Sequence, residues 1–383
     1  MNQFVFSMDS HVVEPRTLWQ EGLPARFKDR ALRAERRDGY IVMTADGKDM
    51  HRMQVGDGNS DNPRIGGTSP ELRFKDMAKD GIDAELLFPN LGMMCYAIDD
   101  AELSLACMQV YNDWLMQQFG AHRDALVPCA VLPMREVAET LAEFERVVAL
   151  GYRAVMLPTL PPAGLRYNNK DFDPVWAYAQ AQKIPLAFHV ASGLTPITER
   201  GPGAAIINYM RLGFATEELV TYMVAGGALD RHPGLTMVVI EAGASWMVAL
   251  GERLDEVNEA HQFYIKPKLG RKPSEILYRQ VKATFQFDRA CLKTIPMTGH
   301  ECLLWASDYP HMEGTFPRSR QVIDEVFGGA GLASEVQADI LGGTAARLYG
   351  LVPRPLADKL ADTLADKLAD KPADKADAGL AAA

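Results

Sequence analysis

The chain has 383 residues, of which 48% are hydrophobic, so it can bury a large core and form one big domain or two smaller ones. Its formal net charge is −10 with a pI of about 5.4, and no compensating basic patch is visible, which argues against a general nucleic-acid or anionic-membrane binder. No apolar run is long enough to predict a membrane span, and the N-terminus lacks a basic and apolar leader, so we expect a cytoplasmic protein.

The five cysteines predict neither disulfides nor a zinc site. They are scattered, odd in number, and form no CxxC pair: Cys95, Cys107, Cys129, Cys291 and Cys302. We therefore expect them to be small buried residues in a reducing compartment.

The chain opens with an apolar, strand-like run that ends in Asp9-Ser-His11. In an extended chain, residues two apart point the same way, so Asp9 and His11 emerge together at the end of this strand. A carboxylate and an imidazole that converge there make half of a metal site. Asp-x-His pairs are common by chance and are mostly hydrogen-bonded turns, so the later strands have to supply the other half.

Residues 16–75 are rich in Arg, Asp and Gly and break the pattern of strands and helices. They include a strand-like piece, Tyr40-Ile-Val-Met, and the turn signals Ala45-Asp-Gly and Gly56-Asp-Gly. We interpret this stretch as an insertion of a hairpin and loops that lies over one end of the domain.

From residue 76 on, apolar strands alternate regularly with helices. Strands are predicted at 82–89, 125–132, 153–158, 184–189, 235–241, 281–288 and 302–308. Helices are predicted at 99–122, 134–150, 171–182, within 206–228, and at 245–261, 289–294, 318–327 and 333–349. With the first strand this makes eight units, which favours a (β/α)₈ TIM barrel over residues 1–352 rather than an open sheet.

Residues 353–383 differ in kind, because Leu-Ala-Asp-Lys recurs with small variations from Leu356 on. Leucines at every fourth position could mark a narrow helical face that binds a partner, but Pro372 interrupts any helix. The low-complexity composition favours a solvated, disordered tail without chemistry.

Ligand-type side chains end several of the predicted strands. Asp9 and His11 end the first, His189 the fifth, Glu241 the sixth and Asp308 the eighth. Each alone is explained by a cap or a local hydrogen bond. Because the carboxyl ends of barrel strands meet at one mouth, their coincidence predicts a shared site.

Two imidazoles and two carboxylates suit one divalent metal ion, Zn²⁺ in preference to Mn²⁺, with a place left for water or substrate. The predicted ligands are Asp9, His11, His189 and Asp308. The fourth strand, Ala154-Val-Met-Leu, carries no Lys that could bridge two metals, so one ion is expected.

Further residues after the strands are candidates for the substrate pocket. Asn90 and Met93 follow the second strand, where apolar neighbours would suit an aromatic substrate, although Met stretches are more often core. Arg211, in the segment after the fifth strand, could hold a substrate carboxylate, with a solvated position as the alternative.

Four stretches together resemble the amidohydrolase-related family, in the branch of aminocarboxymuconate-semialdehyde decarboxylase. They are Met8-Asp-Ser-His-Val-Val-Glu-Pro, Ala187-Phe-His189, Ile240-Glu-Ala-Gly-Ala-Ser-Trp and Ala306-Ser-Asp-Tyr-Pro-His. The resemblance implies a (β/α)₈ barrel with one metal held by the residues predicted above. It also implies hydrolysis or non-oxidative decarboxylation of small, often aromatic or unsaturated, carboxylic acids, and a homodimer.

The sequence departs from the family pattern at two positions. Asp9 stands where many of the family's decarboxylases have His or Glu, and Glu241 stands where they have a catalytic His. A Glu beside a metal can act as general base toward water and then as acid, whereas decarboxylation needs a proton for carbon, which His311 could deliver.

The main hypothesis is therefore a metal-dependent hydrolase that uses Glu241 and Asp308. The alternative is a non-oxidative decarboxylase of the aminocarboxymuconate-semialdehyde or resorcylate type, and the second alternative is a non-catalytic barrel that binds a ligand.

Overall fold

The computed structural model describes residues 3–54, 64–161, 165–193 and 198–361 of the chain. Eight parallel strands stand side by side in the order of the sequence: β1 (Phe6–His11), β5 (Ala84–Phe88), β6 (Leu126–Val131), β7 (Ala154–Pro158), β8 (Leu186–His189), β9 (Met237–Ile240), β10 (Val281–Phe285) and β11 (Leu303–Trp305). Each of the eight predicted strands is present. The prediction of a (β/α)₈ barrel is confirmed.

The barrel closes where the last strand meets the first. Ser10 and Tyr309 form an isolated parallel bridge, and the backbone N–H of Asp308 donates to the carbonyl of Asp9 at 2.9 Å. Below this, the hydroxyl groups of Ser7 and Ser307 lie 2.8 Å apart in a hydrogen bond. Closure therefore depends on short contacts just beyond β11, and these contacts hold Asp9 and Asp308 close together.

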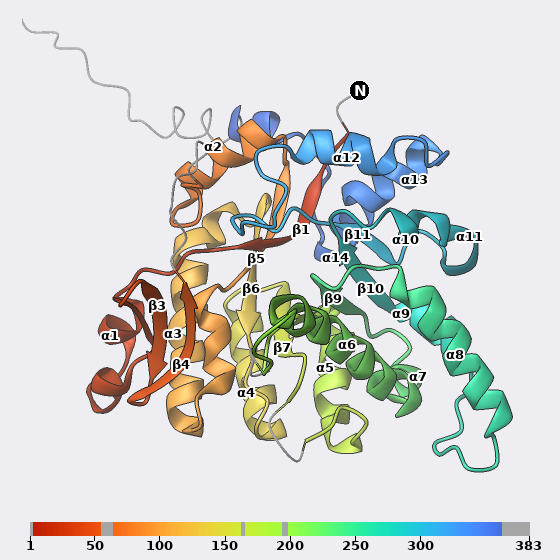
Figure 1. The fold of residues 1–383 in the computed structure, drawn as a ribbon, viewed down its shortest axis with the longest axis horizontal. Helices are drawn as coiled ribbons and strands as arrows, with labels where there is room; N and C mark the ends of the chain where they lie inside the picture. The colour runs from red at the N-terminus through yellow and green to blue at the C-terminus, as the bar shows by residue number, and fades with distance from the viewer. Residues whose placement is uncertain (1–2, 55–63, 162–164, 194–197, 362–383) are drawn as a thin grey trace, which may run out of the picture.

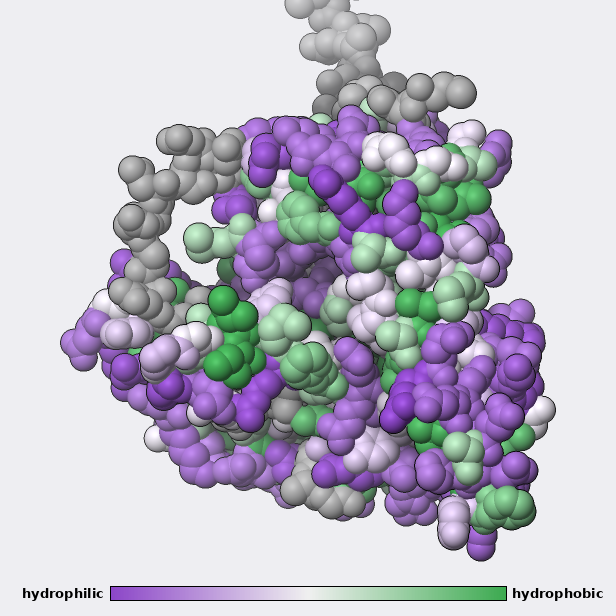
Figure 2. All heavy atoms as spheres, turned by 45° about the vertical axis from the view of Figure 1, so that its right-hand side comes forward, coloured by the Kyte–Doolittle hydropathy of each residue, from purple (hydrophilic) through white to green (hydrophobic). Residues whose placement is uncertain are grey.

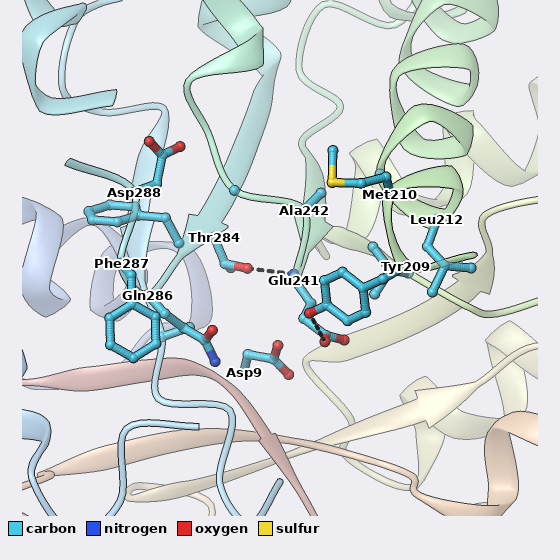
Figure 3. A pocket seen from close by; sticks show the side chains of 15 residues that line it. Asp9, Tyr209, Met210, Leu212, Glu241, Ala242, Thr284, Gln286, Phe287 and Asp288 are labelled. Atoms are coloured by element: carbon cyan, nitrogen blue, oxygen red, sulfur yellow. Dashed lines mark hydrogen bonds between the residues drawn. The ribbon is translucent and has the colours of Figure 1, made fainter. Parts of the chain in front are cut away.

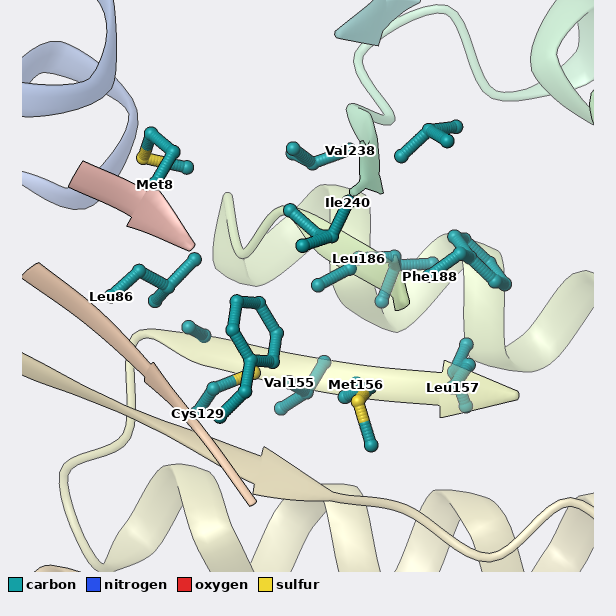
Figure 4. Packing of buried hydrophobic residues seen from close by; sticks show 14 of the residues in the cluster. Met8, Leu86, Cys129, Val155, Met156, Leu157, Leu186, Phe188, Val238 and Ile240 are labelled. Atoms are coloured by element: carbon teal, nitrogen blue, oxygen red, sulfur yellow. The ribbon is translucent and has the colours of Figure 1, made fainter. Parts of the chain in front are cut away.

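Buried apolar side chains from neighbouring strands fill the core. Figure 4 shows Met8 of β1, Leu86 of β5, Met156 of β7 and Ile240 of β9 among them, and each of these four is fully buried. Strands that are buried on both faces read as continuous apolar runs, which is why they could be recognised in the sequence.

Helices surround the barrel (Figure 1). They are α1 (Leu18–Gly22), α2 (Pro70–Asp80), α3 (Ala101–Phe119), α4 (Val137–Ala149), α5 (Asp173–Gln182), α6 (Ala204–Ala225), α7 (Ala228–Arg231), α8 (Trp246–Ala260), α9 (Pro273–Gln280), α10 (Arg289–Lys293), α11 (Ile295–Thr298), α12 (Ser319–Phe327), α13 (Ser334–Ala338) and α14 (Thr344–Tyr349). The predicted helices agree with these within a few residues. Five helices were not predicted: α1, α2, α7, α9 and α11. α1 and the start of α2 lie inside the stretch interpreted as an insertion, and α7, α9 and α11 are short.

A three-stranded antiparallel sheet follows β1, formed by β2 (Arg33–Arg37), β3 (Tyr40–Ala45) and β4 (Lys48–Gln54). The turn between β3 and β4 holds Asp46 and Gly47 at positive φ, as a tight hairpin turn requires. The sheet is tied to the start of α3, because Lys48 pairs with Asp99 at 2.6 Å. The second turn signal, at residues 56–58, lies outside the described residues.

The start of the repetitive C-terminal stretch packs on the barrel. Residues 356–361 are helical and Leu356 is only 4% exposed. The backbone N–H of Leu356 donates to the Asp83 carboxylate at 2.9 Å, and Lys359 donates to the carbonyl of Asp124 at 2.8 Å. Asp83 and Asp124 precede strands, so this helix covers the end of the barrel opposite the mouth. The prediction of a disordered tail now concerns residues 362–383, which lie outside the described residues.

The face of the molecule in Figure 2 is mostly hydrophilic, with hydrophobic side chains in scattered groups. Within the described residues, no helix combines the length and the apolar character that crossing a bilayer would require. All five cysteines are buried and free, as the sequence predicted.

We expect Asp83→Ala to destabilise the fold without touching the mouth of the barrel. The Asp83 carboxylate accepts hydrogen bonds from the backbone N–H groups of Val5 and Leu356, both at 2.9 Å, and its loss would leave two buried donors unpaired. Each such group costs about 1–3 kcal/mol, so the midpoint of urea unfolding should fall clearly. Asp358→Ala, at an exposed aspartate of the same C-terminal helix, is the control and should leave the midpoint unchanged.

Candidate active site

The ligand-type residues predicted from the sequence gather at the carboxyl end of the barrel. Asp9 and His11 lie at the end of β1, His189 ends β8, and Asp308 follows β11. All four side chains are buried, with at most 1% of Asp9 exposed. The barrel thus brings together residues that are up to 299 positions apart in the chain (308 minus 9).

The ligand atoms of Asp9, His11 and His189 lie within 4.8 Å of one another, and Asp308 forms a second such group with His11 and His311. The Nε2 atoms of His11 and His189 are 3.2 Å apart, and Asp9 Oδ1 lies 3.4 Å and 3.3 Å from them. Asp308 joins the group through its Oδ1, which lies 3.5 Å from His11 Nε2.

Backbone carbonyl groups fix the tautomers of both histidines. His11 Nδ1 lies 2.8 Å from the carbonyl of Pro89, and His189 Nδ1 lies 2.9 Å from that of Val190. Because a carbonyl oxygen can only accept, each Nδ1 carries the hydrogen and each neutral ring turns the lone pair of its Nε2 inward. This arrangement is the usual support for a histidine that binds a metal.

The converging atoms are all acceptors, and several have no partner. Among the described residues, Asp9 Oδ2 and Asp308 Oδ2 are buried without a hydrogen-bond partner, and Asp308 Oδ1 is paired with His311 Nδ1, at 2.8 Å. Buried carboxylates need a proton, a hydrogen-bond donor or a cation. Two imidazoles and two carboxylates with such unpartnered acceptor atoms fit a divalent metal ion.

Burial and neighbouring charges shift the pKa values of the two histidines in opposite directions. Burial lowers the pKa of His11 to about 3, aided by repulsion from His311. Burial acts in the same direction on His189, but Asp9 and Glu241 outweigh it and raise its pKa to about 9. Without a metal, the site therefore keeps a proton on His189, and a metal ion would take that proton's place.

Two of the polar residues at the mouth have a left-handed backbone. Glu241 has φ of 65° and Asp308 has φ of 55°, which non-glycine residues seldom adopt. Such a conformation costs about 1–3 kcal/mol and is typical of functional sites, where it directs a side chain. At Glu241 it is held by a 2.8 Å hydrogen bond from the backbone N–H to the hydroxyl of Thr284.

Glu241 stands beside the converging atoms rather than among them. Its Oε2 lies 3.8 Å from His189 Nδ1, and its Oε1 accepts a 3.3 Å hydrogen bond from Tyr209. Burial raises the pKa of Glu241 to about 8, against the opposing effect of His189. Glu241 also forms a cluster of carboxylates with Asp308 and the exposed Glu313.

His311 lies on the other side of Asp308. Its Nδ1 is 2.8 Å from Asp308 Oδ1, and its ring stacks on that of His11 with the centroids 4.1 Å apart. A quarter of its side chain is exposed, so it can reach a substrate.

Two adjacent pockets open onto this site. The smaller one, of about 280 Å³, is lined by Asp9, Glu241 and residues of α6 and of the segment after β10 (Figure 3). The larger, of about 520 Å³, is lined by His311 and by Met93, Met94 and Met312. The pockets share four residues as walls: Val190, Tyr209, Leu212 and Glu241.

The three predicted substrate residues have different positions. Asn90 and Met93 line the larger pocket. Arg211 lines neither of the two pockets, because its side chain is half exposed and pairs with Glu199 at 2.6 Å. The structure thus gives no support to Arg211 as a clamp for a carboxylate, since its charge is neutralised at the surface.

Several lining residues were not recognised in the sequence. Met43 and His51 of the inserted sheet are register partners and line the larger pocket. Gln286 lines the smaller pocket from the segment that follows β10, and Glu313 lines the larger one. Only Gln286 gave a usable signal, as a polar residue at the end of a predicted strand.

Comparison with known proteins supplies a family. The family model described as amidohydrolase matches residues 23–351. No curated protein matches the sequence significantly.

Solved structures share the fold at low sequence identity. An amidohydrolase from Mycobacterium avium subsp. paratuberculosis K-10 superimposes with a TM-score of 0.77 and 21% identity, covering 91% of this chain and 100% of its own. The 5-carboxyvanillate decarboxylase of Sphingomonas paucimobilis superimposes with a TM-score of 0.65 and 21% identity, covering 91% of this chain and 100% of its own. A dihydroxybenzoic acid decarboxylase from Polaromonas sp. JS666, with bound manganese and 2-nitroresorcinol, superimposes with a TM-score of 0.61 and 17% identity. The match covers 91% of this chain and 97% of the decarboxylase.

We expect the purified protein to hold about one divalent ion per chain, and His189→Ala to lose it, because the variant removes one of two inward Nε2 atoms. Elemental analysis after gel filtration measures this. His300→Ala is the control, since His300 binds Asp339 away from the site. A His189→Ala protein that retains its metal would contradict the ligand assignment.

Proposed function

Because this chain belongs to the amidohydrolase family, we propose that it is a metal-dependent decarboxylase, which removes a carboxyl group without oxidation from a small aromatic acid. The observation that carries this proposal is the position of His311. It lines the larger pocket, contacts Asp308 and stacks on His11, so a proton donor stands beside the proposed metal ligands. Decarboxylation needs such a donor, because carbon has to receive a proton.

In this proposal Asp9, His11, His189 and Asp308 hold one divalent ion. When bound, the ion supplies positive charge that binds a substrate carboxylate and a neighbouring oxygen. The ligand set accepts Zn²⁺ or Mn²⁺, and we favour Mn²⁺ because a structural neighbour is described with bound manganese. This choice replaces the preference for Zn²⁺ drawn from the sequence.

The protein's own residues then position the acid and move one proton. The bond between the ring carbon and the carboxyl carbon breaks, its electron pair stays on the ring carbon, and carbon dioxide leaves. His311 gives a proton to that carbon from Nε2, since its Nδ1 faces Asp308. It regains a proton from water through its exposed side.

The lining of the larger pocket supports an aromatic substrate. Met93, Met94 and Met312 offer flexible, polarisable surface to a ring, and Met43 extends this surface from the inserted sheet. Structural neighbours described as decarboxylases act on dihydroxybenzoate and carboxyvanillate, which are aromatic acids of suitable size.

Hydrolysis is the second candidate, and Glu241 is the observation that favours it. Its carboxylate lines both pockets next to the proposed metal ligands, where it could take a proton from water and return it to a leaving group. In the proposed decarboxylation Glu241 transfers no proton, whereas in hydrolysis it would be the general base. The two candidate functions therefore predict different effects of replacing Glu241.

We expect His311→Asn to lower the rate of carbon dioxide release by about 100-fold or more, because general acids contribute about 10²–10⁴ in rate. Its metal content should stay normal. Glu241→Gln is the matched variant and should retain most of the activity, whereas a hydrolase would lose nearly all of it.

Isotopes separate the two reactions directly. In D₂O, the decarboxylase product should carry deuterium on the ring carbon that held the carboxyl group, as NMR would detect. Incorporation of ¹⁸O from labelled water into the product, without release of carbon dioxide, would establish hydrolysis instead.

A further inference from the structure

We propose that the substrate carries an uncharged oxygen substituent that accepts a hydrogen bond from Gln286, and that the site rejects a second carboxylate at this position. The inference deepens the proposed function, on which it rests for the acid nature of the substrate. It names Gln286 as a specificity-determining residue.

The amide of Gln286 is a donor without an acceptor. Its Nε2 is buried and has no hydrogen-bond partner within the described part of the chain. Figure 3 shows this amide pointing into the smaller pocket, toward the carboxylates of Asp9 and Glu241. The NH₂ end faces these carboxylates, because an amide oxygen turned toward them would be repelled.

A buried donor of this kind is satisfied when a ligand brings an acceptor. A hydroxyl, methoxy or carbonyl oxygen on the substrate ring can fill that role. With the reacting carboxyl group at the proposed metal ligands and the ring in the larger pocket, such a substituent would enter the smaller pocket, which also contains Asp9.

The charge of the two pockets disfavours a second anionic group. Among the described residues that line the two pockets there is no Arg or Lys. The carboxylate of Glu241 lines both, and that of Glu313 lines the larger. A bound divalent ion would offset Asp9 and Asp308 but would leave these two glutamates beside the ligand. A carboxylate substituent in the smaller pocket would therefore lose its hydration without an Arg or Lys to pair with, which costs more than burying a neutral oxygen.

The walls of the smaller pocket leave room for a neutral group. Val190 and Leu212 form apolar surface between the two pockets, and Phe287, half exposed, stands at the rim. Gln286 is thus a buried donor in a pocket with apolar walls on one side and Asp9 and Glu241 on the other, where a single hydrogen bond can discriminate between ligands.

The test measures binding rather than turnover. Protein saturated with Mn²⁺ is titrated calorimetrically with 2-hydroxybenzoates that carry either a methoxy or a carboxylate group at ring position 3, 4, 5 or 6. We expect at least one methoxy compound to bind about tenfold tighter than its carboxylate counterpart. Gln286→Leu, which keeps the size but removes the donor, should weaken that methoxy compound about fivefold, as the loss of one neutral hydrogen bond predicts.

Gln286→Lys supplies the cation that the pockets lack, and it should reverse the preference in favour of the carboxylate compound. Arg289→Ala, at an exposed residue just after this segment that lines neither pocket, is the control and should keep the preference of the wild type. Equal or tighter binding of the carboxylate compounds by the wild type would overturn the inference, and so would binding by Gln286→Leu that matches the wild type. Failure of every methoxy compound to bind would overturn it as well.

The outcome is independent of the reaction type. If the methoxy preference depends on Gln286 but no carbon dioxide is released from any aromatic acid, the proposed reaction is wrong and the assignment of Gln286 stands. If carbon dioxide is released but the preference is absent, the assignment of Gln286 is wrong and the reaction stands.

Discussion

The site depends on two backbone carbonyl groups, those of Pro89 and Val190. Each accepts the Nδ1 hydrogen of one histidine, which leaves the Nε2 lone pairs of His11 and His189 facing each other at 3.2 Å. Two lone pairs at this distance repel, and the nearby carboxylate of Asp9 adds negative charge. These groups need a positive charge between them, which a proton on His189 supplies and which the proposed metal ion would supply in its place.

The barrel holds this strained arrangement through contacts behind it. Arg73 of α2, which is fully buried, donates to the carbonyl of His11 at 2.6 Å and pairs with Glu85 of β5. Its guanidinium also lies over the ring of Tyr309, 4.5 Å from the centroid, next to the residue that closes the barrel. One buried cation therefore contacts the end of β1, which carries Asp9 and His11, and the segment after β11 that follows Asp308.

Selectivity arises from elements outside the regular barrel. The inserted sheet brings Met43 and His51 to the larger pocket, and the segment after β10 brings Gln286 to the smaller. The strands fix the ligands of the proposed metal, whereas these appended segments decide what else can bind.

A homodimer and a cytoplasmic location remain predictions from the sequence and the family.

The sequence by itself determined the eight-stranded barrel and the residues at its mouth. Buried parallel strands are continuous apolar runs, and each polar residue that ends such a run has to lie at the same edge. Asp9, His11, His189, Glu241, Asp308 and His311 were all found on this basis. Asn90 and Met93 followed from their position after the second strand.

Only the tertiary structure decided which of these residues touch and what surrounds them. Arg211 was a candidate to hold a substrate carboxylate, with a solvated position as the alternative, and it lies half exposed, paired with Glu199 at 2.6 Å. Met43 and His51 escaped prediction, since the inserted strands carry no periodic signal that tells which face meets the pocket. Gln286 was overlooked although it is a polar residue at the end of a predicted strand. Local patterns in a sequence record which side of an element is buried, and the distances between elements depend on how all of them pack at once.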